Sequence, residues 1–145
     1  MPAATMESWL VWAVLSAVFA ALTAVFAKVG VAGIHPDLAT LVRTLVILPL
    51  LAAIVTAGGA WQDPASVPGR TWIFLILSGL ATGASWLCYF RALKLGEAAR
   101  VAPVDKLSVV LVAIFGVVFL GETLSRTAAL GVLLIAAGAV LVAVG

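Results

Sequence analysis

Long apolar runs alternate with short polar segments along the whole chain. Five runs are long enough to cross a membrane as helices, because a hydrocarbon core of ~30 Å at a rise of ~1.5 Å per residue needs ~20 residues. The runs cover residues 9–27, 38–55, 71–90, 101–120 and 127–145. They are apolar on every face, whereas a membrane β-strand is short and alternates in polarity. The pattern therefore predicts an all-α fold, a bundle of five transmembrane helices that form one domain.

Composition changes this picture little. The chain is 65% hydrophobic and 10% charged, too few polar residues to build a water-exposed surface, so membrane lipid is the expected partner of that surface. Its basic residues separate the apolar runs and do not follow one face, so we expect no nucleic-acid partner. One Cys and one His exclude an intrachain disulfide and a thiolate metal cluster. Nucleotide-binding and hydrolase motifs are absent, so we predict neither an enzyme, nor a cofactor, nor an ATP-driven pump.

The basic residues are distributed unequally between the two sides of the predicted bundle. Short connections make neighbouring helices antiparallel, and five spans place the termini on opposite sides. Six of the eight Lys and Arg residues then share the side of the C-terminus, here called the basic side: Lys28, Arg43, Arg91, Lys94, Arg100 and Lys106. Positive charge favours the cytoplasm. We therefore predict a multi-pass protein of the plasma (inner) membrane with its N-terminus outside and its C-terminus in the cytoplasm.

Three charged residues fall within predicted spans, where an ion costs roughly 2.5–3.5 kcal/mol at the helix centre. They are Arg43, Asp105 and Lys106, all toward the basic side. In one interpretation Arg43 and Lys106 extend to the lipid headgroups and Asp105 pairs with one of them. In the other, Arg43 and Asp105 line a polar cavity. Trp86 and Tyr89 lie near the same side and complete the candidate substrate-binding residues.

Glu122 follows the fourth run at the opposite boundary. It either caps or charge-stabilises the start of the last helix, or it binds a proton or a gate partner.

Small residues recur at helical spacing within several runs. Gly79 and Gly83 form a GxxxG pattern, and Gly131, Gly138 and Gly145 repeat every seven residues. Such stripes allow close helix approach in lipid, either within one chain or between chains.

Several segments are similar to a known family. Leu120-Gly121-Glu122-Thr123-Leu124, followed by a last helix with spaced glycines, resembles the C-terminal signature of the EamA-type domain of the drug/metabolite transporter superfamily. Ser78–Gly83, Tyr89–Leu93 and Ala102–Leu107 resemble its single-domain branch. The resemblance implies a five-helix unit, and most relatives carry two such units in inverted orientation. It therefore implies a secondary transporter that moves small polar or amphipathic metabolites by alternating access and works as an oligomer.

The expected partner is a second copy of the chain, or a related five-helix protein of opposite charge bias. An inverted homodimer requires nearly balanced Lys and Arg between the two sides, which this chain lacks, so we favour a homodimer with both copies the same way up. The inverted homodimer remains the alternative that the family resemblance implies. Residues 9–27 contain no acid, unlike the first helix of the small multidrug antiporters, and this argues against the proton-for-cation exchange of those antiporters.

The alternative function is a membrane subunit that transports nothing and stabilises a partner.

Overall fold

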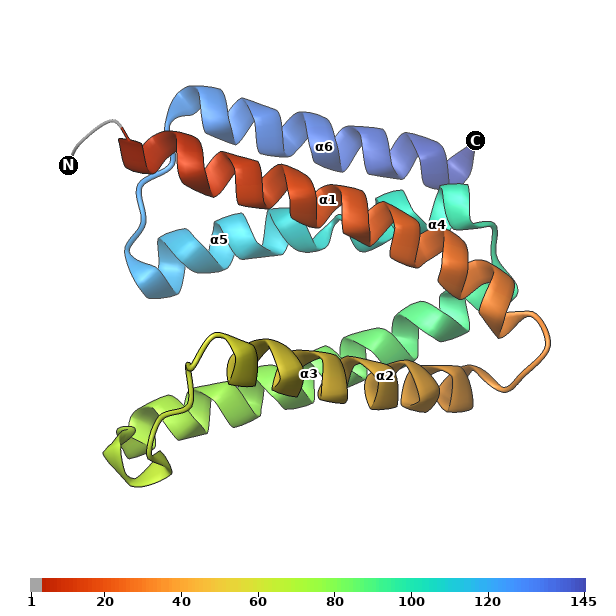
Figure 1. Cartoon of the computed structure of the whole chain (residues 1–145). Helices are drawn as coiled ribbons and strands as arrows, with labels where there is room; N and C mark the ends of the chain where they lie inside the picture. The colour runs from red at the N-terminus through yellow and green to blue at the C-terminus, as the bar shows by residue number, and fades with distance from the viewer. Residues whose placement is uncertain (1–3) are drawn as a thin grey trace. The chain divides into compact units, whose positions relative to one another are not determined.

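The computed structural model describes the backbone of residues 4–145 and the side chains from Trp9 onward. The predicted all-α class is confirmed: no strand occurs within the described residues, and five helical segments there have the length and apolar character of membrane spans. In order, the elements are α1 (Ala4–Val31), α2 (Pro36–Ala57), the short 3₁₀ helix η1 (Pro64–Ser66), α3 (Gly69–Leu95), α4 (Ala98–Asp105), α5 (Ser108–Leu120) and α6 (Arg126–Val144) (Figure 1).

Local sequence signals set the ends of these helices. Before α2, Nδ1 of His35 accepts a hydrogen bond from the amide of Asp37, and Pro36 occupies the first helical position, where no amide donor is needed. Before α6, the Ser125 hydroxyl accepts from the amide of Ala128 at 3.1 Å. Gly121 ends α5 with φ of 69°, a left-handed conformation that favours glycine. Short polar segments thus start and stop helices whose interiors are mostly apolar.

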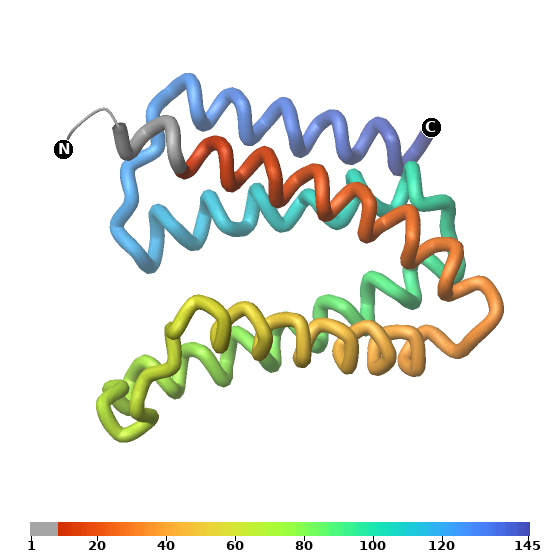
Figure 2. Tube along the Cα trace, viewed as in Figure 1, coloured from red at the N-terminus to blue at the C-terminus, as the bar shows by residue number. Residues whose placement is uncertain are grey.

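The fourth span is divided, which the apolar run 101–120 did not predict. Helix α4 ends at Asp105 and α5 begins at Ser108, with a turn at Lys106 and Leu107. Through this turn the amides of Leu107, Val109 and Val110 bond to carbonyls three residues back, each at 3.0 Å, so the backbone tightens locally to 3₁₀ geometry. The Cα trace shows the two halves following one another along a single path (Figure 2). A polar interruption therefore lies within a membrane span.

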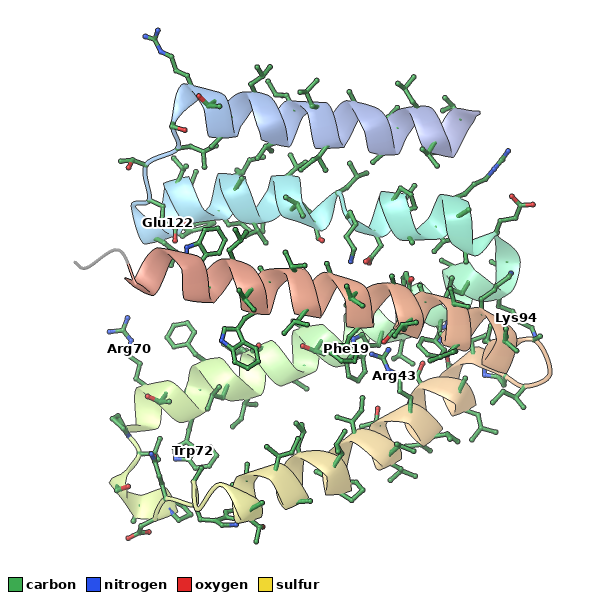
Figure 3. All side chains as sticks on the ribbon, turned by 45° about the horizontal axis from the view of Figure 1, so that its top comes forward. Phe19, Arg43, Arg70, Trp72, Lys94 and Glu122 are labelled. Atoms are coloured by element: carbon green, nitrogen blue, oxygen red, sulfur yellow. The ribbon has the colours of Figure 1, made fainter. Side chains whose placement is uncertain are left out.

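The chain divides into two compact units. The first contains the residues up to Val25 and Leu95–Gly145, and in it α4 and α5 both pack against α6. The second is Phe26–Lys94, which contains the end of α1, all of α2 and all of α3 except Leu95. In the second unit α2 and α3 lie closest where α2 begins and α3 ends (Figure 3). Its most buried side chains, Val31 and Leu93, belong to the same end.

Most large apolar side chains point outward. Leu48 of α2 and Phe119 of α5 are 66% and 75% exposed, and similar side chains occur along every long helix. A surface of this kind is unfavourable in water and favourable in hydrocarbon, where burial of apolar groups is not required. The outward apolar faces therefore identify the protein as an integral, multi-pass membrane protein.

Candidate functional site

Arg43 reaches from α2 to an aromatic surface on α3 (Figure 3). It is the eighth residue of α2, so it lies roughly 10 Å along the helix axis from Pro36. The central carbon of its guanidinium group lies 4.1 Å from the Trp86 ring centroid and 5.7 Å from that of Phe90. Trp86 and Phe90 are four residues apart and share one face of α3. We call Arg43, Trp86 and Phe90 the Arg43 site.

The guanidinium of Arg43 has no hydrogen-bond or ion-pair partner among the side chains that the structure describes. Among the side chains from Trp9 onward, no acid lies within ion-pair distance of its guanidinium, and the group makes no hydrogen bond to a described residue. Stacking on aromatic rings satisfies the face of a guanidinium, while its five N–H donors point outward in the plane. A partly buried cation is thus held at membrane depth with its donors available.

Two of the predicted substrate-binding residues, Arg43 and Trp86, are therefore brought together. Tyr89 is partly buried on the next turn of α3 from Trp86 and immediately precedes Phe90. Phe90, only 3% exposed, was missed by the sequence analysis. The spacing of Trp86 and Phe90 by one helical turn was the available signal, but it identifies a shared face without identifying the helix opposite.

A pair of reciprocal lysine contacts joins the ends of α1 and α3. The Lys28 ammonium donates to the carbonyl of Leu93 at 2.7 Å. Lys94 belongs to the last turn of α3, and its side chain reaches the turn between α1 and α2 (Figure 3). There its ammonium donates to the carbonyls of Val31, Ala32 and Ile34 at 2.9, 2.7 and 3.3 Å. The last carbonyls of a helix lack intrahelical donors and carry partial negative charge, so each lysine satisfies the end of the other helix. We call this arrangement the lysine clasp.

An ion pair lies beside the lysine clasp. Arg91 donates through Nε and one terminal nitrogen to the two carboxylate oxygens of Asp37, at 3.0 and 2.9 Å. This is the two-point geometry in which an arginine recognises a carboxylate best. The clasp connects the end of α3 to the end of α1 and the turn after it, and the ion pair connects the end of α3 to the beginning of α2.

Asp105 and Lys106 occupy the break between α4 and α5. The Lys106 ammonium lies 3.2 Å from one carboxylate oxygen of Asp105, so these neighbours pair with each other, as the first interpretation of the charged residues expected. Arg43 belongs to the second unit and Asp105 to the first. A cavity shared by Arg43 and Asp105 stays a prediction.

Glu122 does not cap the last helix, because the Ser125 hydroxyl accepts the capping hydrogen bond of α6. Its side chain instead folds back over α5, where Glu122 is labelled in Figure 3. A Cβ atom on Gly116 would lie 2.5 Å from Oε2 of Glu122, so the carboxylate occupies space that only glycine leaves open. The amide of Glu122 also donates to the Gly116 carbonyl at 3.0 Å. Ser125 and not Glu122 therefore makes the capping hydrogen bond, while charge stabilisation of the start of α6 by Glu122 and a role in proton binding or gating stay predictions.

An apolar groove of about 410 Å³ runs between α5 and α6. Residues from both helices line it, including Ala113, Val117, Ala129 and Val132, and all of its lining side chains are apolar. Such a surface suits an acyl chain or another helix and offers no polar group to orient a solute.

Comparison with known proteins agrees with the fold and covers nearly the whole chain. Residues 7–144 match the EamA-like transporter family. A curated relative from Sinorhizobium sp., named "Uncharacterized transporter in cobO 3'region", is 72% identical over 138 residues, which are 95% of this chain and 98% of the relative. No solved structure matches. The extent of the family match and the identity to this relative show that the chain belongs to the EamA-like transporter family.

Proposed function

We propose that the protein is a secondary transporter of small polar or amphipathic metabolites and that it works by alternating access. Family membership supports a transporter over an enzyme. The relative named as a transporter matches almost from end to end, which supports the same role for this chain. Metabolites are the expected cargo because the described chain offers individual polar groups at membrane depth and no extended polar surface.

The Arg43 site is the observation that carries this proposal. A charged side chain within a span is costly, and in membrane proteins it commonly marks a substrate or ion pathway. Arg43 lies against Trp86 and Phe90 and has no acidic partner among the side chains from Trp9 onward, whereas Arg91 donates two hydrogen bonds to Asp37. The break between α4 and α5 adds support, since interrupted helices are typical of carrier binding sites.

Solute counterflow in liposomes containing the purified protein tests the function. Amino acids, hydroxy acids, nucleosides, sugars and organic cations are loaded inside, and uptake of the labelled solute is followed. Accelerated exchange of at least one class supports a transporter. Exchange at the rate of empty liposomes for every class would contradict it and favour the non-transporting subunit.

We propose that the C-terminus faces the cytoplasm. The excess of Lys and Arg on the basic side supports this orientation. A fluorescent reporter fused after Gly145 is expected to fluoresce in cells, and a phosphatase fused at the same place is expected to be inactive. An active phosphatase together with a non-fluorescent reporter would contradict this orientation and place the C-terminus outside.

The working unit is proposed to be an oligomer, with a homodimer the same way up as the simplest form. Carriers are commonly built from two repeats, which are related either by inversion or by an axis along the membrane normal, and a five-helix unit supplies one repeat, so the other must come from a second chain. Gly79, Gly83, Gly131 and Gly138 support this, because a Cβ atom at any of them would meet nothing within 4 Å. These small-residue faces are open to a neighbouring helix.

Cross-linking in native membranes tests the oligomer. In a Cys88→Ala background, single cysteines at Gly131, Gly138 and Gly145 are expected to give a dimer through a short bifunctional reagent. Cross-links between like positions at Gly145 indicate copies the same way up, since an inverted pair places these ends on opposite sides. Monomer alone at every position, with transport retained, would contradict the oligomer.

A further inference from the structure

We propose that the solute recognised at the Arg43 site is a monoanion carrying a carboxylate, which binds to the in-plane N–H donors of Arg43. This inference rests on the proposed transport function and names the chemical class of its substrate. It begins from a contrast between two arginines of the same unit. Arg91 has one polar edge, formed by Nε and a terminal nitrogen, engaged by the Asp37 carboxylate, while Arg43 has aromatic contacts and no carboxylate partner among the described side chains.

The Asp37–Arg91 pair provides the geometry that a bound carboxylate would adopt. In that pair two N–H donors meet two oxygens at 3.0 and 2.9 Å. The central carbon of the Arg43 guanidinium lies over the Trp86 ring, 4.1 Å from its centroid, and we infer that the N–H donors at the edges of the group are the recognition surface. A planar carboxylate fits this fork through two parallel hydrogen bonds. A neutral amide offers only one acceptor oxygen to the same donors.

The number of positive charges favours a monoanion over a phosphate dianion. Arg43 is the cation stacked on this aromatic surface. The other three cations of the same end of the unit already have partners: Lys28 and Lys94 donate to main-chain carbonyls, and Arg91 pairs with Asp37. A dianion bound beside one arginine would keep excess negative charge at membrane depth, which is costly. The Trp86 and Phe90 rings add an apolar surface for the remainder of the solute.

The test compares carboxylates with their own amides. Counterflow is measured in phosphatidylcholine liposomes for hydroxy, amino, keto and aromatic monocarboxylates, each paired with its primary amide, with phosphate monoesters alongside. Fluorescence of the purified protein in nanodiscs provides a binding readout that does not need transport, with Trp86→Phe identifying the Trp86 contribution. At least one carboxylate is expected to bind and exchange roughly 10- to 100-fold better than its amide, the difference that hydrogen bonds to charged groups supply.

Arg43→Gln is expected to remove this discrimination, and Arg43→Lys, which keeps the charge and loses the planar fork, to retain part of it. Arg70→Gln is the matched control, because Arg70 also lies over an aromatic ring, Phe74, at 5.7 Å but at the opposite end of α3. The control is expected to discriminate like the wild type.

Each other outcome has a distinct meaning. Exchange of amides, sugars or cations that is unchanged by Arg43→Gln would overturn the carboxylate inference and leave the transport function standing. An Arg43-dependent preference for phosphate monoesters would overturn it in the same way. No exchange and no fluorescence change with any solute would overturn both the inference and the transport function.

Discussion

Replacing Lys28 and Lys94 together by methionine is expected to lower the free energy of unfolding by about 2–4 kcal/mol. The double variant removes the donors from four carbonyls at the ends of α1 and α3, among them that of the fully buried Leu93. A hydrogen bond to a charged group contributes roughly 1.5–3 kcal/mol to the free energy of unfolding. Because Lys94 is exposed, we expect its hydrogen bonds to contribute near the lower end of this range. Methionine preserves most of the side-chain length, so the lost donors dominate.

The measurement is unfolding in mixed micelles with increasing dodecyl sulfate, followed by tryptophan fluorescence. Arg100→Met combined with Lys106→Met is the matched control, because it removes the same charge from the same side. Arg100 forms an exposed ion pair with Glu97 at 3.6 Å, and Lys106 forms one with Asp105 at 3.2 Å. Exposed ion pairs contribute little to the free energy of unfolding. Equal stability of the two double variants would mean that the lysine clasp does not hold α1 and α3 together.

Hydropathy alone was sufficient to predict the five spans. Lipid imposes two simple requirements, a helix about 20 residues long and an apolar surface, and both can be read from composition. The helix ends were less predictable. Helices α1 and α3 extend through Lys28 and Lys94, which the apolar runs excluded, because these cations bond to the carbonyls at helix ends. That contact joins residues more than 60 positions apart, so no local pattern indicates it.

The break in the fourth span was also hidden from the sequence pattern. Asp105 and Lys106 could be identified as charges, and Pro103, which lacks an amide donor, could either loosen this end of the helix or occupy its first position. The sequence pattern did not decide between these two interpretations. The backbone tightens between Lys106 and Val110. Glu122 presents a similar case, since its contact with Gly116 depends on the left-handed Gly121 reversing the chain.

The candidate site was predictable in part. The cost of a charge in a span singles out Arg43, and the aromatic character of Trp86 made it a candidate on the same side. Sequence could not show that Arg43 stacks on Trp86 and Phe90, or that Asp37 is committed to Arg91. Both facts depend on how α2 and α3 meet. They distinguish Arg43, which has no acidic partner among the described side chains, from Arg91, which donates two hydrogen bonds to Asp37.

Arg43→Gln is expected to reduce transport by at least about tenfold, because a substrate held by charged hydrogen bonds loses roughly 1.5–3 kcal/mol when they are removed. Insertion should be unaffected or improved, since the substitution removes a charge from a span. Asp105→Asn is expected to reduce transport as well if Asp105 and Arg43 line one cavity. Membrane levels and elution from size exclusion are compared first, so that lost protein is not taken for lost transport.

Two further variants separate binding from packing at this site. Trp86→Phe retains an aromatic ring beneath the guanidinium and is expected to weaken transport less than Trp86→Ala, because a cation–π contact contributes ~0.5–2 kcal/mol. Arg70→Gln is expected to transport normally. A loss with Arg70→Gln equal to that with Arg43→Gln would indicate a general effect of removing positive charge.

The ratio of counterflow rates between wild-type protein and Arg43→Gln, at equal protein content in liposomes, tests the central claim most directly. A transporter that recognises its solute at Arg43, Trp86 and Phe90 predicts rapid exchange in the wild type and a rate at least about tenfold lower in the variant. Equal rates in the two proteins would contradict this site, and a wild-type rate no higher than that of empty liposomes would contradict the transport function.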